Sequence, residues 1–208
     1  MEPEQVLTQV AEEVSGCTRC KLQYSRKLGV PGAGPADAEV VFIGEGPGFH
    51  ENIQGKPFVG AAGEFLDELL ESIGMSREEV FITNVVKCRP PGNRDPRPDE
   101  LEACSSYLDR QLRAINPKVV VTLGRYSMAR YISNAKISEI HGQPINIRGL
   151  LVVPFYHPAA ALHRPSLRSV VQEDFAKLPE LIENAEEVPT YEEEISAQDD
   201  QAEQLSLF

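Results

Sequence analysis

The sequence lacks two features that would send a chain to or through a membrane. None of its 208 residues belongs to an apolar run that approaches the length of a membrane span. The first ten residues, MEPEQVLTQV, are acidic and amphipathic, without the basic and apolar regions of a signal peptide. We therefore expect a cytoplasmic protein with a single core of ordinary size and no membrane partner.

Basic residues are absent from the last part of the chain. No Lys or Arg follows Lys177, whereas ten of the 32 acids lie between Glu180 and Glu203, which leaves 22 acids against 20 bases upstream. The formal net charge of −12 thus belongs mostly to the C-terminal end. We predict a nearly neutral folded domain over residues 1–180, able to bind a polyanion through local basic patches, and a flexible acidic tail over residues 181–208.

Apolar runs and amphipathic segments alternate along the chain. Strands are predicted at residues 39–44, 80–86, 118–124 and 150–158, and helices at residues 4–14, 64–74, 99–115, 125–132 and 170–185. Near-continuous apolar strands between helices predict an α/β fold with a parallel sheet covered on both faces. Polar motifs follow each strand, and the carboxyl ends of parallel strands meet at one edge, so these motifs should converge in one crevice.

The first of these motifs is the glycine-rich stretch GEGPGFHENIQGKPFVG, residues 44–60. It lacks the Gly-Lys-Ser/Thr ending of a phosphate loop and the spacing of a dinucleotide turn. The carboxylate of Glu45 would also repel a phosphate. The loop is therefore expected to face a ligand that is neutral or that develops positive charge.

Cysteines are scarce, but their spacing is informative. Cys17 and Cys20 form a C-x-x-C pair, and Cys88 and Cys104 follow later in the chain. Disulfides are not expected in a cytoplasmic chain, and four cysteines in this arrangement are typical of a four-thiolate metal site. Zinc and a four-iron cluster both accept four thiolates, so spacing alone does not choose between them, and unconnected buried thiols are the competing interpretation.

Several motifs together resemble a known family. GEGPG, GKPFVGAAG, ITNVVKCRPPGNR, the four cysteines and HPAA occur in the order found in the family 4 uracil-DNA glycosylases of bacteria and archaea. The resemblance covers about residues 10–180. It implies a three-layer α/β/α sandwich around a short parallel sheet and favours a [4Fe–4S] cluster over zinc. It also implies that the protein flips uracil out of single- or double-stranded DNA and hydrolyses its N-glycosidic bond, leaving an abasic site for base excision repair.

The resemblance assigns roles to residues that contact the base. Asn84 presents an acceptor and a donor that match uracil N3–H and O4 but not cytosine. Phe58 stacks on the flipped base. His157 hydrogen-bonds uracil O2 and stabilises the charge that grows as the bond breaks. Glu45 stabilises the positively charged sugar or orients the attacking water, and Gly44 and Gly46 lie beside it.

Other assigned residues lie around the base. Glu51 packs against uracil C5 and excludes thymine. Leu162, with Ala161 beside it, fills the gap left by the flipped base. Arg89 and Arg164 contact the DNA backbone, and further candidates for this role are Arg94, Arg97, His163 and Arg168.

Three alternative functions remain open. The chain could be a noncatalytic adaptor that reads damaged DNA or bridges DNA and another protein. It could also belong to a related subgroup that traps uracil-DNA covalently through a histidine on an inserted basic loop, for which His141 is the candidate. A nucleotide hydrolase is disfavoured because the phosphate loop is absent.

The final residues QLSLF resemble a short peptide that bacterial partners insert into the replicative sliding clamp. The residues involved would be Gln204, Leu205, Leu207 and Phe208. Exposed Leu and Phe at a solvated terminus otherwise have little reason to be there. We expect a monomer that associates with the bacterial nucleoid and is tethered to the clamp.

Overall fold

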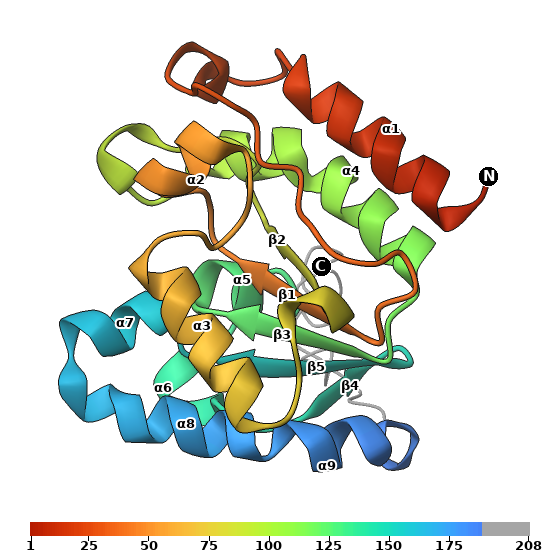
Figure 1. Ribbon diagram of the computed structural model, residues 1–208, viewed down its shortest axis with the longest axis vertical. Helices are drawn as coiled ribbons and strands as arrows, with labels where there is room; N and C mark the ends of the chain where they lie inside the picture. The colour runs from red at the N-terminus through yellow and green to blue at the C-terminus, as the bar shows by residue number, and fades with distance from the viewer. Residues whose placement is uncertain (189–208) are drawn as a thin grey trace, which may run out of the picture.

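The computed structural model describes residues 1–188 and contains one five-stranded sheet at its centre (Figure 1). The strand order is β2-β1-β3-β5-β4. The strands are β1 (Val40–Gly44), β2 (Phe81–Asn84), β3 (Val119–Leu123), β4 (Ile145–Ile147) and β5 (Leu150–Phe155). Neighbours among β2, β1, β3 and β5 pair in parallel, while β4 forms an antiparallel edge on β5.

Helices cover both faces of the sheet (Figure 1). The long ones are α1 (Pro3–Ser15), α3 (Ala61–Ser72), α4 (Pro98–Ile115) and α8 (Arg168–Ala176). The short ones are α2 (Phe49–Gln54), α5 (Arg125–Ala129), α6 (Ile137–Ile140), α7 (Pro158–His163) and α9 (Leu178–Glu183). Together they give the expected three-layer α/β/α sandwich. None of the helices within residues 1–188 combines the length and apolarity needed to span a bilayer.

The alternation of side chains along β1 explains the three layers. Val40 and Phe42 point into a core shared with α3 and α8, where Phe42 and Phe175 stack with ring centroids 5.9 Å apart. Val41 and Ile43 point the other way, into a core shared with α4. Because successive side chains leave a strand on opposite faces, an all-apolar strand requires cover on both sides.

The N-terminal helix α1 forms a further layer outside α4. Val10 and Val14 of α1 are fully buried, together with Tyr107 of α4 and the buried cysteines Cys88 and Cys104. The segment that follows α1 carries the C-x-x-C pair. The packing of α1 on α4 thus brings the first two cysteines near the last two.

Several short elements were not predicted from the sequence. Helices α2 and α7 lie in stretches that we expected to be loops, and the expected helix over residues 170–185 breaks at Lys177 into α8 and α9, with Pro179 in the first turn of α9. Packing also continues past residue 180, since Val188 contacts the core and its carbonyl accepts a hydrogen bond from Asn146 Nδ2 at 2.9 Å. The clamp-like residues 204–208 lie outside the described part of the chain.

Candidate functional site

A pocket of about 430 Å³ opens where the parallel strands β1, β2 and β5 end. The residues after β1, β2 and β5 meet there, which is the convergence that the strand pattern predicted. The pocket is lined by Glu45, Gly46, Pro47, Gly48, Glu51, Phe58, Gly60, Ala61, Ala62, Asn84, Pro90, Asn93, Arg94, His157, Ala159, Ala160 and His163.

Asn84 ends β2 and is only 2% exposed. Within residues 1–188, its Oδ1 is one of three buried side-chain oxygens that have no hydrogen-bond partner. An unpaired buried acceptor costs free energy, so in native proteins it is normally satisfied by a donor. Because Asn84 lines the pocket, a bound ligand with an N–H group can supply that donor.

Gly44, at the end of β1, lies next to the side chains of Asn84 and Phe58. A Cβ at this position would lie 2.4 Å from Asn84 Oδ1 and 2.8 Å from the Phe58 ring. Both distances are too short for any side chain. Glycine is therefore required here so that the amide and the aromatic ring can approach the same point.

A buried lysine holds the backbone of Asn84 in place through a hydrogen bond. Lys87 is 1% exposed, and its Nζ donates to the Asn84 carbonyl at 2.9 Å, to Thr83 Oγ1 at 2.5 Å and to Gln111 Oε1 at 2.7 Å. Thr83 Oγ1 and Gln111 Nε2 in turn donate to the carbonyl of Pro31. Burial lowers the pKa of Lys87 to about 7. The sequence motif KCRPP had not identified this side chain as part of the site.

His157 precedes α7 and faces the pocket as a neutral donor. Its Nδ1 accepts a hydrogen bond from the Ala159 backbone N–H at 3.1 Å, so the proton of the neutral ring lies on Nε2. The ring keeps some exposure, yet the protein packed around it desolvates it and lowers its pKa to about 4. At neutral pH the ring can therefore donate from Nε2 without carrying charge.

Phe58 lies against His157, with the ring centroids 5.3 Å apart and the planes inclined by 22°. Its backbone has φ +51°, a left-handed conformation that is costly for a bulky residue. Arg77 stabilises this turn by donating to the carbonyls of Pro57 at 3.0 Å and Phe58 at 2.7 Å. A Cβ at Gly63 would lie 2.0 Å from the Phe58 carbonyl oxygen, so the second glycine of GAAG is a packing requirement. Sequence reasoning missed Arg77 and Gly63.

Glu45 follows β1 and lines the same pocket. Burial, together with the nearby Asp95, raises the pKa of its carboxyl group to about 7, while Arg125 acts in the opposite direction. Arg125 also forms an ion pair with Asp95, so the two charges near Glu45 partly cancel each other. Near pH 7 the carboxyl group can exist in either protonation state, which suits a group that handles protons or positive charge.

Glu51 lines the pocket from α2 and organises the loop that carries Phe58. Its Oε1 accepts hydrogen bonds from the backbone N–H groups of Val59 at 2.9 Å and Gly60 at 3.1 Å. The expectation from the sequence was contact with the base alone. The structure adds a second task, because this carboxylate joins α2 to residues 58–60.

The residues expected to contact DNA differ in how free their side chains are. Leu162 is 41% exposed on α7, next to the pocket-lining His163, and Arg164 at the end of α7 is exposed. Arg89 donates from Nε to Asn93 Oδ1 at 2.7 Å. Arg94 lines the pocket but makes a two-bond ion pair with the buried Glu100.

His141 does not line the pocket. Its Nδ1 lies 2.7 Å from Asp174 Oδ2, and its ring packs on Tyr156 with centroids 4.8 Å apart. The carboxylate of Asp174 is almost completely buried, so this contact is a structural link between α6 and α8. The geometry gives no support to His141 as a group that attacks a bound nucleotide.

The four cysteines line a second, smaller pocket together with Tyr107. Two of the sulfurs have N–H donors: Arg26 Nη1 lies 3.3 Å from Cys88 Sγ, and the Lys87 backbone N lies 3.2 Å from Cys104 Sγ. Burial raises the pKa of Cys104 to about 11. Within residues 1–188, no three His, Cys, Asp or Glu side chains form a group that could hold a metal ion.

Comparison with known proteins agrees with this fold and site. The family description "Uracil DNA glycosylase superfamily" matches residues 31–180, and the chain belongs to this superfamily. A type-4 uracil-DNA glycosylase of Saccharolobus solfataricus is 51% identical over 183 residues, which cover 83% of this chain and 85% of the relative. Type-4 enzymes of Sulfurisphaera tokodaii (49% over 187 residues, 84% of each chain) and Thermotoga maritima (44% over 184 residues, 86% of this chain and 96% of the relative) are similar to it as well. Within the superfamily, the chain is therefore a type-4 member.

Proposed function

We propose that the protein excises uracil from DNA by hydrolysing the bond between the base and the sugar. The unpaired Oδ1 of Asn84 is the observation that carries this proposal, because Asn84 lines the same pocket as the neutral donor His157 and the ring of Phe58. Type-4 relatives that share up to 51% identity are named uracil-DNA glycosylases, which supports the assignment independently.

Recognition follows from the order of donors and acceptors. Asn84 Oδ1 accepts from uracil N3–H, and its Nδ2 donates to O4; cytosine presents the reverse pattern at these two positions. Phe58 stacks on the flipped base, and Glu51 closes the side of the pocket near C5. An adaptor that only bound DNA would have no need for these groups in one pocket.

Hydrolysis requires charge to be stabilised at two places. As the C1′–N1 bond breaks, its electron pair moves to uracil, and the Nε2–H of His157 donates to O2, where negative charge develops. The sugar becomes positively charged, and the carboxylate of Glu45 stabilises it or orients the water whose oxygen bonds to C1′. The proton of that water goes to Glu45 or to solvent, the uracil anion takes up a proton from solvent, and the products are uracil and an abasic site.

The second pocket suits a [4Fe–4S] cluster held by Cys17, Cys20, Cys88 and Cys104. In such a cluster each iron binds one thiolate, so the four cysteines that line one pocket can supply its complete set of ligands. The cluster would act as a structural cross-link between the segment after α1 and the segment that contains α4. No step of the hydrolysis passes through it.

We also propose that the C-terminal residues Gln204 to Phe208 bind the sliding clamp. The protein would then act as a monomer that is tethered to the clamp near the nucleoid. These residues lie beyond the described chain, and the argument rests on the sequence QLSLF after an acidic segment. Deleting residues 205–208 should abolish clamp binding and leave excision on short oligonucleotides unchanged. Clamp affinity that survives the deletion would refute this assignment.

The first test of the proposed activity is cleavage of a labelled single strand that contains uracil, followed by alkaline treatment. Thymine and cytosine strands are the controls, and a denaturing gel detects covalent adducts. An abasic product confined to uracil supports hydrolysis. The absence of product would favour the adaptor, and a stable protein–DNA adduct would favour the trapping subgroup.

A further inference from the structure

An exposed aromatic side chain stands at the rim of the uracil pocket. Phe49 is the first residue of α2 and is 54% exposed, whereas Phe58, further along the same loop, is 5% exposed. The guanidinium carbon of Arg89 lies 5.3 Å from the centroid of the Phe49 ring. An aromatic ring left this open, with a cation over it, requires an explanation other than core packing.

The position of the pair links it to the uracil site. Gly48 and Glu51, on either side of Phe49 in the chain, both line the pocket. On the other side, Arg89 donates to Asn93, which also lines the pocket. Phe49 and Arg89 therefore join the loop after β1 to the loop after β2 at the edge of the cavity.

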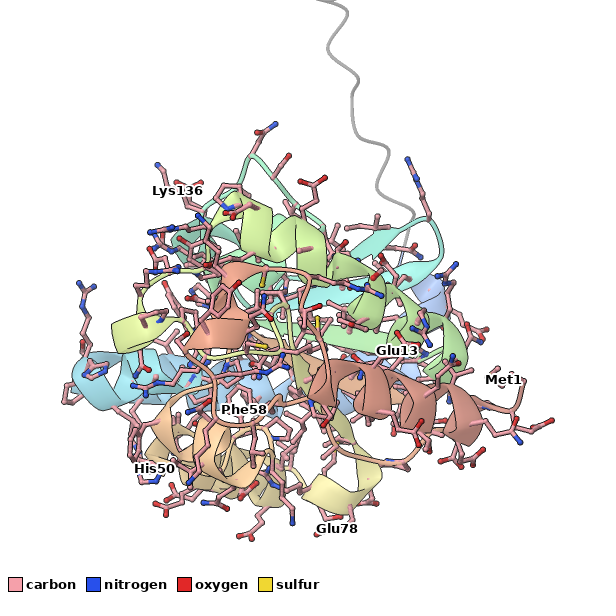
Figure 2. The ribbon with its side chains drawn as sticks, turned by 90° about the horizontal axis from the view of Figure 1, so that it is seen from above. Met1, Glu13, His50, Phe58, Glu78 and Lys136 are labelled. Atoms are coloured by element: carbon pink, nitrogen blue, oxygen red, sulfur yellow. The ribbon has the colours of Figure 1, made fainter. Side chains whose placement is uncertain are left out.

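The Phe49 ring lies on the outer side of the loop that carries both phenylalanines. Next to it, His50 makes an edge-on contact with Phe49, with centroids 5.4 Å apart and planes at 87°. Figure 2 places His50 at the periphery of the molecule and Phe58 further inward. The two phenylalanines thus offer two different surfaces: Phe58 inside the pocket and Phe49 outside it, on the same connection.

A single strand of DNA that places one base in the pocket must lay its neighbouring nucleotides along the rim. Proteins bind such nucleotides by stacking bases on aromatic rings and by cations that contact the backbone. Phe49 and Arg89 supply these two groups side by side. We propose that Phe49, supported by Arg89, is a stacking subsite for the base next to the flipped uracil; this inference rests on the proposed function.

The test combines a variant with a substrate that lacks the neighbouring base. Phe49→Ala and Phe49→Tyr are compared with wild type on short single strands in which the nucleotide 5′ or 3′ to uracil is either normal or abasic. Excision gives kcat/KM. Fluorescence anisotropy of a strand with non-cleavable 2′-fluoro-deoxyuridine gives the affinity.

We expect Phe49→Ala to weaken binding and lower kcat/KM about tenfold on normal strands, and Phe49→Tyr to stay near wild type. Removing the base on one side of uracil should lower kcat/KM of the wild type by the same tenfold factor. On that strand, Phe49→Ala should have the same kcat/KM as the wild type. The side on which this occurs identifies the 5′ or 3′ position. Ile53→Ala is the matched control, because Ile53 is an exposed apolar residue of the same helix, and it should leave both values unchanged.

Two results would overturn the proposal: no loss with Phe49→Ala, or an equal loss whether the neighbouring base is present or absent. The second result would mean that the ring stabilises α2 without contacting DNA. Failure of the proposed function is distinguishable, since wild type would then release no uracil, while the anisotropy measurement would still report whether the ring stacks on a base.

Discussion

The uracil pocket and the thiol pocket both draw on residues 84–104 but differ in how their polar atoms are satisfied. Asn84 and Arg94 line the first, and Cys88 and Cys104 line the second. In the uracil pocket a buried acceptor, Asn84 Oδ1, has no partner within the described residues, whereas in the thiol pocket two sulfurs accept N–H groups. The first arrangement suits a ligand that comes and goes, and the second suits a group that is held permanently.

Lys87 connects the two pockets. Its backbone N–H donates to Cys104 Sγ, and its side chain donates to the carbonyl of Asn84. Lys87 therefore links Cys104 to the backbone of Asn84. The comparison implies that variants in the uracil pocket change the rate of excision, variants in the thiol pocket change stability, and Lys87 affects the reading of the base.

The largest expected effect on rate belongs to His157. His157→Ala removes the donor to uracil O2 and should lower kcat by about 10²–10³-fold, as for other donors that stabilise developing negative charge. Because the change is confined to the uracil pocket, iron content and Tm should stay close to wild type. Single-turnover excision measures the loss, with Ile53→Ala, an exposed residue that does not line the pocket, as the control. A loss below about threefold would contradict the assigned role.

Cys88→Ser should give the opposite pattern. Removing one thiolate should strongly reduce the iron content and lower Tm by about 10 °C or more, because binding of a structural metal group contributes directly to folding. The protein that remains folded should still prefer uracil to thymine and cytosine. Iron analysis and thermal unfolding are the measurements. A variant with full iron and unchanged Tm would exclude Cys88 as a ligand.

The pH dependence of excision should follow Glu45. Its pKa is raised to about 7, so the carboxylate form increases as pH rises through 7, and kcat/KM should fall about tenfold per pH unit well below that value. His157, with a pKa of about 4, stays neutral over this range and adds no step. Glu45→Gln should be slower and lose this acidic limb. An unchanged limb in Glu45→Gln would assign it to another group.

The same carboxyl group should affect stability in the opposite sense. Because its folded pKa is raised, the folded state loses stability as pH rises from the unfolded value of about 4.5 to about 7. Glu45→Gln should therefore have a higher Tm than wild type at pH 8 and a similar Tm at pH 4. Thermal unfolding at the two pH values checks this sign. A Tm gain of the same size at both would mean that the charge is not responsible.

The smallest effect is expected for Lys87→Met. The substitution removes the Nζ donor from Thr83 Oγ1, Gln111 Oε1 and the carbonyl of Asn84. The resulting displacement of Asn84 should reduce kcat/KM by about tenfold. In an Asn84→Ala background the same change should cause no further loss, because the group that Lys87 positions is gone. Additive losses in this double-mutant cycle would show that Lys87 acts on stability alone.

The strand ends were predictable because they depend on local pattern. The centres of two predicted strands, residues 40–43 and 80–82, are apolar throughout, and the polar residues near their ends, Glu45 and Asn84, had to meet at one edge of a parallel sheet. The clustering of four cysteines followed from their number and spacing together with the packing of α1 on α4. These features require only periodicity and the rules of sheet topology.

The remainder depends on tertiary contacts that no local pattern encodes. Lys87 lies in a loop motif where a solvated cation would be the default, and only the fold reveals its burial under Asn84. Arg77 reaches back 19 residues to the carbonyl of Phe58, and the requirement for Gly63 is visible only once that carbonyl is placed beneath it. Likewise, α2 and α7 are six residues each, too short for a clear helical period.

The most direct test of the account compares uracil with 3-methyluracil in the same single strand. Methylation removes the N3–H that Asn84 Oδ1 is expected to accept, so wild type should excise 3-methyluracil at least about 10²-fold more slowly than uracil. In Asn84→Ala, uracil excision should fall toward the 3-methyluracil rate, and the difference between the two bases should largely disappear. Excision of 3-methyluracil by wild type at the uracil rate would contradict the claim that the unpaired oxygen of Asn84 reads the base.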